Sequence, residues 1–217
     1  MRGVVSVLAV AVLVAAAPLV AQPNTLSGSA GGPHPPLVLS PQGTEVLFRG
    51  DLVPEIGIGC SNGTGNSGGP NDVAVQVTAS LVPPLDIIST TYNVFTNLGF
   101  VVTHSFVAWA GGAVPGLEIG RQPTPPGPGN VTAAITPAIQ VTSASFHFGF
   151  NQPQTAAGMR WGLDTSGGGT ADSFIRASAC GLSSWGTLTS IGLPGNWVMA
   201  AVVDETIPVE LTAFDVE

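Results

Sequence analysis

Few side chains in this sequence could do chemistry, and the first to consider are two carboxylates at the ends of a glycine-rich turn. Asp164 and Asp172 enclose the string TSGGGTA. Such a turn can wrap carboxylate and carbonyl oxygens around Ca²⁺, a hard cation that takes roughly six to eight oxygen ligands. The same residue types also build a plain hairpin turn. Two interpretations of Asp164 and Asp172 therefore stay open, a calcium site and a turn without metal.

A second candidate is Ser67, in the string GNSGGP at residues 65–70. This string resembles the nucleophile motif of trypsin-like serine proteases, in which the serine lies beside a histidine and a glycine-rich oxyanion hole. In that family the histidine and aspartate come earlier in the chain, on a complete first barrel. Here His34, between prolines, is the only histidine before Ser67. We therefore expect a surface loop, which uses the same residue types.

The other histidines and the tryptophans lie in strand-like runs. His104 has no acid beside it in the chain and is expected to be structural. In ASFHFGF, residues 144–150, the phenylalanines share one face, so they should enter the core while His147 points outward. Tryptophans could stack on sugar rings if they are exposed, although core packing is the commoner use; the candidates are Trp109, Trp185 and Trp197.

Two cysteines, Cys60 and Cys180, are the only ones in the chain. They are expected to form one disulfide if the protein reaches an oxidising compartment, and to remain two separate thiols otherwise. A bridge would close a loop of about 120 residues, for which chain entropy gives an upper value of roughly 4 to 5 kcal/mol.

The elements that must position these groups are predicted to be strands. Residues 72–80, DVAVQVTAS, alternate apolar and polar side chains, and residues 197–203 are apolar on both faces. Glycine and serine turns separate the short apolar runs between residues 158 and 204. The proline-rich string RQPTPPGPGN at 121–130 is expected to be a connection outside any ladder. The sequence predicts an all-β fold, an antiparallel β-sandwich of jelly-roll or immunoglobulin-like type.

The N-terminus has the pattern of a secretory signal peptide. Arg2 precedes an apolar run at residues 4–17, and small residues follow Pro18 up to Ala21. The run is too short to span a bilayer, and no cysteine follows it for lipid attachment. We expect a signal peptide at 1–21, a flexible leader rich in glycine and proline at 22–36, and a single β-sandwich domain at 37–217.

The charge of the expected mature chain excludes some partners. Its 196 residues carry thirteen acids against four arginines and no lysine, a net charge of −9. Without a basic stripe it has nothing with which to neutralise phosphates, so nucleic acid and anionic membranes are poor partners. No second apolar stretch long enough for a membrane span follows residue 21.

The C-terminal string IPVELTAF at 207–214 resembles the PVELxxF segment near the ends of exported bacterial proteins, especially those with type IX secretion sorting domains. The string LPGNW at 193–197 is similar to a strand entry in secreted bacterial β-sandwich modules. The resemblance implies bacterial origin and export. In those proteins tens of residues follow the segment, so type IX attachment is not expected for this sequence.

These observations favour a non-catalytic module outside the cell or on its surface, with a structural, adhesive or self-assembly role and no cofactor. The alternative is a lectin-like module that binds extracellular glycans, with calcium beneath the site. A hydrolase that uses His104 or His147 ranks last, because no convergent nucleophile and base can be identified in the sequence.

Overall fold

A computed structural model describes residues 43–59, 68–96, 103–154, 159–166, 171–193 and 195–206. These residues belong to one compact unit that begins at Gln42, and this unit is described by itself. The expected signal peptide, the leader and the C-terminal segment from residue 207 lie outside the described residues.

One sheet is built on the long strand β4. In spatial order it contains β1 (Thr44–Phe48), β13 (Met199–Glu205), β4 (Leu85–Thr96), β9 (Met159–Asp164) and β12 (Asn196–Trp197). The strand β7 (Gly129–Val141) pairs with β4, and β2 (Ile56–Ile58) pairs with β9. We call this sheet A.

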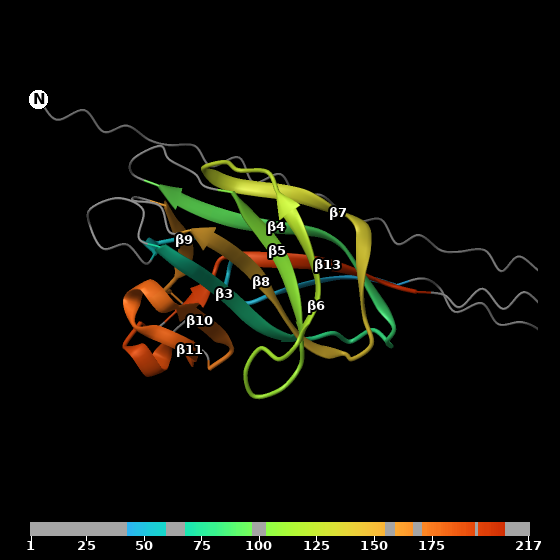
Figure 1. The fold of residues 1–217 in the computed structure, drawn as a ribbon. Helices are drawn as coiled ribbons and strands as arrows, with labels where there is room; N and C mark the ends of the chain where they lie inside the picture. The colour runs from blue at the N-terminus through green and yellow to red at the C-terminus, as the bar shows by residue number, and fades with distance from the viewer. Residues whose placement is uncertain are drawn as a thin grey trace, which may run out of the picture. The chain divides into compact units, whose positions relative to one another are not determined.

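The second sheet, sheet B, has the order β11 (Leu182–Thr187), β10 (Ser173–Ala177), β3 (Gly68–Thr78), β8 (Ser145–Gln154), β5 (His104–Ala110) and β6 (Glu118–Thr124). Two 3-10 turns, η1 (Ser178–Cys180) and η2 (Thr189–Ile191), flank β11. The two antiparallel sheets pack against each other, as Figure 1 shows, so the predicted all-β sandwich is confirmed. Among the described residues, no helix has the length and apolar character needed to cross a membrane.

The core between the sheets follows from strand alternation. Phe146, Phe148 and Phe150 of β8 are fully buried, as predicted from their spacing. Val73 and Val75 of β3 enter the same cluster, because their register places them opposite Phe150 and Phe148. Burial of each such side chain stabilises the fold by roughly 1.5 to 3 kcal/mol, so the β3–β8 pair forms the centre of the core.

The prediction of a connection outside any ladder at 121–130 was wrong at both ends, because 121–124 belong to β6 and 129–130 to β7, and it holds for 125–128. Pro123 of β6 lies opposite Ser105 of β5. The physical reason is that β6 is the last strand of sheet B, so a proline nitrogen can face outward without removing a ladder hydrogen bond.

A smaller apolar cluster covers the outer face of sheet B. Ala74, Val107, Trp109 and Phe174 are buried there, and Trp185 of β11 packs against them. His147 lies on this outer face, as predicted, and is nevertheless completely buried. Phe174 of β10 and Trp185 of β11 belong to this cluster, and Figure 1 shows β10 and β11 at one side of the sheet.

Candidate functional site

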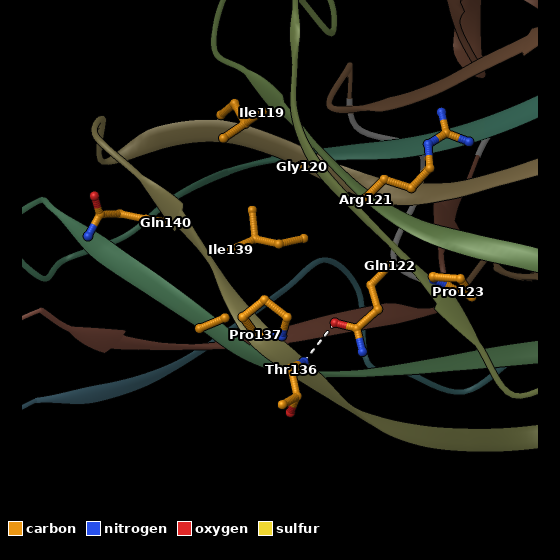
Figure 2. Close-up of a pocket in the computed structure, with 10 residues that line it drawn as sticks. Ile119, Gly120, Arg121, Gln122, Pro123, Thr136, Pro137, Ile139 and Gln140 are labelled. Carbon is orange, nitrogen blue, oxygen red and sulfur yellow. Dashed lines mark hydrogen bonds between the residues drawn. The ribbon is translucent and has the colours of Figure 1, made fainter.

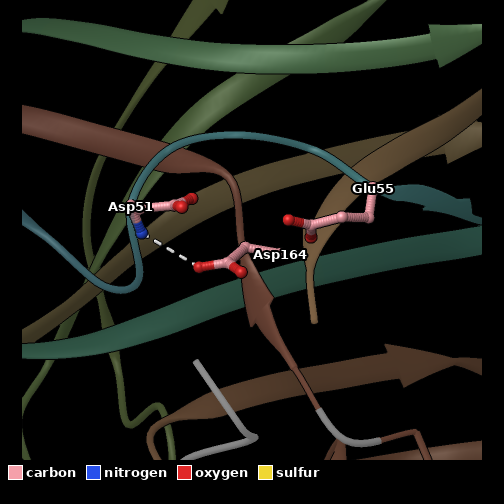
Figure 3. A group of neighbouring side chains, drawn as sticks. All are labelled: Asp51, Glu55 and Asp164. Carbon is pink, nitrogen blue, oxygen red and sulfur yellow. Dashed lines mark hydrogen bonds between the residues drawn. The ribbon is translucent and has the colours of Figure 1, made fainter. Parts of the chain in front are cut away.

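Three carboxylates meet at the end of β9, and we call them the acidic group: Asp51, Glu55 and Asp164. One carboxylate oxygen from each lies within 4.8 Å of the others. Figure 3 shows them converging from the β1–β2 connection and from the last residue of β9. Asp164 is 1% exposed, whereas Asp51 and Glu55 are exposed.

The fold brings this group together through tight backbone contacts. The strand β2 pairs with β9, so Ile56 lies opposite Leu163 and Glu55 comes beside the end of β9. Gly50 has a φ of 69°, which favours glycine, and any side chain there would collide with the Asp164 carboxylate. Glycine at this position therefore allows the chain to pass directly over Asp164.

Backbone donors already hold each of these carboxylates. Asp164 accepts hydrogen bonds from Asp51 N at 2.9 Å, Ser166 N at 2.9 Å and Ser166 Oγ at 2.7 Å. Glu55 accepts one from Thr165 N at 2.6 Å, and Asp51 accepts one from Val53 N at 2.9 Å. The acidic group therefore fastens two turns to each other, and its outward oxygens could contribute to a cation site only as part of a larger oxygen shell.

The structure gives the two acids of the predicted calcium turn different neighbours. Asp164 belongs to the acidic group, whereas Asp172 forms an ion pair with Arg49 at 3.3 Å. Residues 167–170 of that turn lie outside the described residues, so calcium binding by Asp164 and Asp172 stays a prediction.

His104 is completely buried between the sheets. Its Nε2 lies 3.0 Å from the Tyr92 hydroxyl, which donates to the Pro125 carbonyl at 2.7 Å. Because the hydroxyl hydrogen points to Pro125, Nε2 carries the proton that bonds Tyr92. The ring also packs edge-on against Trp161, and burial raises the pKa of Tyr92. Through these contacts His104 packs in the interior of the protein.

His147 is the second buried histidine, and it lies on the outer face of sheet B. Its Nδ1 donates to the Ala110 carbonyl at 3.3 Å, and its ring packs edge-on against Phe174 at 5.1 Å. Burial lowers the pKa of His147, and the hydrogen bond to the Ala110 carbonyl and the nearby Asp172 carboxylate oppose this change only in part. The imidazole is therefore held neutral.

A chain of polar contacts runs across the same face. Arg176 donates to Asp72 at 2.6 and 2.9 Å, and Asn151 donates to the other oxygen of this buried carboxylate. Arg121 donates to Asn151 at 2.5 Å and pairs with Glu118 at 2.7 Å. These contacts connect β10, β3, β8 and β6 and give the buried Asp72 carboxylate a guanidinium and an amide as partners.

Two of the three tryptophans proposed for sugar stacking are enclosed. Trp197 is fully buried and donates Nε1 to the Phe174 carbonyl at 2.8 Å, and Trp109 is 4% exposed. Trp185 is half-buried, with its ring under the Arg176 guanidinium at 4.8 Å. Stacking by any of the three stays a prediction, and Trp185 is the one that solvent can reach.

A groove of about 580 Å³ lies where β6 and β7, the neighbouring edges of the two sheets, approach each other. Its walls are Ile119–Pro123 and Thr136–Gln140. Figure 2 shows Gln122 reaching across it, with Oε1 accepting from Thr136 N at 2.7 Å. Its Nε2 donates to the Ala134 carbonyl at 3.4 Å. The Gln122 amide thus takes the place of a neighbouring peptide group beside β7.

Several predicted groups cannot be compared with the structure. Ser67 and Cys60 lie outside the described residues, so the loop interpretation of Ser67 and the Cys60–Cys180 bridge stay predictions. Cys180 ends η1, directly after β10.

Sequence analysis did not single out Asp51 or Glu55. Asp51 is 113 residues from Asp164 in the chain, and no local spacing marks the contact. The one local signal was Gly50 before Asp51, a dipeptide that many turns share. Comparisons with protein-family models, curated proteins and solved structures find no match to this chain.

Proposed function

We propose that this protein is an exported, non-catalytic module that acts outside the cell or at its surface, with a structural, adhesive or self-assembly role. The observation that carries the proposal is the burial of the two histidines in the described strands. His104 and His147 are both completely buried, and each is bonded to a protein oxygen and packed against aromatic rings. A general base must reach its substrate, and these rings are committed to the interior.

The distribution of charge supports the same role. The buried carboxylates Asp72 and Asp164 both accept hydrogen bonds from the protein, which is how a β-sandwich fastens its strands and turns. Export rests on residues 1–21 and on the predicted disulfide. The C-terminal resemblance adds bacterial origin to the proposal.

The experiment is expression of the full chain in a bacterial host, followed by analysis of the secreted fraction. We expect a mature protein that begins at Gln22 and associates or adheres without turning over ester, peptide or glycoside substrates. Mass spectrometry measures where the mature chain begins. Light scattering and negative-stain microscopy measure whether it associates. A protein retained in the cytoplasm with residues 1–21 intact would contradict the export part of the proposal.

The second candidate function is a lectin-like module that binds extracellular glycans with support from calcium. The observation that favours it is the acidic group, which brings three carboxylates within 4.8 Å beside the turn that follows β9. A glycan array with calcium and with a chelator separates the two candidates. Glycan binding that disappears with chelator and in Asp164→Asn would replace the first candidate by the second.

A further inference from the structure

Among the residues that the structure describes, β1 pairs with β13 alone, so one edge of sheet A is open there. The Gly43 carbonyl just before β1 accepts a hydrogen bond from Glu205 N at 3.2 Å. In an antiparallel ladder, residues alternate between those that bond the neighbour and those that face away from it. Glu45 and Leu47 therefore bond β13, whereas the peptide groups of Thr44, Val46 and Phe48 point to the open edge.

Two of these three residues, Val46 and Phe48, carry exposed apolar side chains. Val46 is 53% exposed and Phe48 is 44% exposed, whereas Leu47 between them is buried in the core. A hollow of about 180 Å³ runs beside the strand, lined by Glu45–Arg49 together with Val77 and Thr78. Peptide donors, peptide acceptors and exposed apolar side chains thus coincide on β1.

The edges on the opposite side of the sandwich are protected in ways that β1 is not. Pro123 lies within β6, Pro137 lies within β7, and the Gln122 amide occupies the backbone groups of Thr136 and Ala134. Prolines and covering side chains are devices that stop strand addition. The β1 sequence TEVLF contains no proline and has high strand propensity.

We propose that β1 pairs with β1 of a second copy of this chain, antiparallel and centred on Val46, so that sheet A continues through a two-fold dimer. Val46 then faces the partner's Val46, and Thr44 and Phe48 face the partner's Phe48 and Thr44. All three residues direct their peptide groups to the partner, which gives roughly six backbone hydrogen bonds. The inference names the partner and the surface of the proposed assembly role, and it rests on that role.

Charge favours this register although the chain is strongly acidic. Centred on Val46, the pairing places Glu45 opposite the partner's Leu47, so the two glutamates do not meet. Each Glu45 carboxylate is also engaged within its own molecule, where it accepts from Ser80 N at 2.8 Å. The exposed valine and phenylalanine meet uncharged side chains, and cross-strand pairs of this kind contribute roughly 0.2 to 1 kcal/mol each.

Five residues per copy make a small contact, below the roughly 1,200 Å² of a standard interface, so the dimer should exchange with monomer as the protein is diluted. Sedimentation velocity on the purified secreted protein, from about 1 µM to about 1 mM, measures this equilibrium. Val46→Lys places two ammonium groups opposite each other and should weaken dimerisation at least about tenfold. Val46→Glu should do the same.

An equal mixture of Val46→Lys and Val46→Glu should dimerise again, because opposite charges then face each other. The matched control is Ile119→Lys on β6, which is 41% exposed and should leave dimerisation unchanged. Circular dichroism confirms that each variant is folded.

Each remaining outcome contradicts the inference in a distinct way. A wild-type protein that stays monomeric at every concentration overturns both the dimer and the self-assembly role. Undiminished association of Val46→Lys, or its loss in Ile119→Lys, overturns the β1 interface and leaves self-assembly in place. Two monomeric variants that fail to combine overturn the register centred on Val46.

Discussion

His147 lies on the outer face of β8, where its Nδ1 donates to the Ala110 carbonyl and its ring packs against Phe174. The spacing of ASFHFGF predicted the face correctly and the exposure wrongly. Alternation within one strand decides which way a side chain points, but cover over that face comes from Trp109, Trp185 and Phe174 on other strands. A single strand carries no signal of this cover.

The neutral state of His147 makes stability depend on pH. Its pKa in the folded protein is lowered from 6.5 by burial, so the unfolded chain binds a proton that the folded chain does not. The free energy of unfolding should therefore fall as the pH drops below about 6.5, by up to about 1.4 kcal/mol per pH unit, until the folded pKa is reached. Above that window His147 contributes no pH dependence.

Urea unfolding at about pH 7.5 and about pH 5.5 measures this difference. The variant His147→Gln keeps an amide donor for Ala110 and removes the titration, so it should lose less stability between the two pH values than wild type. His34→Gln, in the expected leader, is the matched control and should behave as wild type. An unchanged pH dependence in His147→Gln would show that another group is responsible.

At the scale of elements, the strand edges are where sequence reasoning and structure differ most. The alternating pattern of residues 72–80 and the phenylalanine stripe at 146–150 predicted strands that the structure contains as β3 and β8. Both are central strands, whose burial imposes a regular pattern. Residues 121–124 can include Pro123 because β6 is an edge strand, and nothing within that string distinguishes an edge strand from a loop.

The Gln122 bridge should protect the edge of β7. Replacing Gln122 with leucine removes both amide contacts, so the Thr136 N–H loses its acceptor and becomes open to solvent. We expect faster hydrogen exchange at Thr136 and a loss of about 1 to 2 kcal/mol in the free energy of unfolding. Hydrogen exchange followed by NMR measures the first and urea unfolding the second.

Gln140→Leu is the matched control for the bridge. Gln140 lines the same groove, but its Nε2 donates to the Thr206 hydroxyl at 3.4 Å, close to the C-terminal end of β7. Exchange at Thr136 should be unchanged in this variant. Equal exchange rates in Gln122→Leu and wild type would mean that the amide bond to Thr136 does not form in solution.

At the scale of the whole molecule, the sandwich could be predicted from composition and alternation, but its acidic group could not. Asp164 was singled out because it precedes a glycine-rich turn. Its partners Asp51 and Glu55 reach it only because β2 pairs with β9, and a pairing between distant strands leaves no mark in local spacing. Sites that depend on long-range pairing are therefore found from the fold and not from motifs.

The predicted Cys60–Cys180 bridge would also join parts of the chain that are distant in sequence. Ala177 at the end of β10 lies opposite Asn71 of β3, and Cys180 follows three residues later. Cys60 precedes the start of β3 by eight residues. Since β3 and β10 are antiparallel, the chain leaves β10 at the end of the pair where it enters β3, so Cys180 lies toward that end of sheet B.

Mass spectrometry of the secreted protein, alkylated without reduction, should detect no modified cysteine and one cross-linked peptide pair. Reduction should lower the free energy of unfolding by up to roughly 4 to 5 kcal/mol, because the unfolded chain regains the freedom of a loop of about 120 residues. A Cys60→Ser, Cys180→Ser variant should match the reduced protein and respond to no reductant. Two alkylated cysteines in protein secreted under oxidising conditions would exclude the bridge, and with it the part of the export argument that rests on disulfide chemistry.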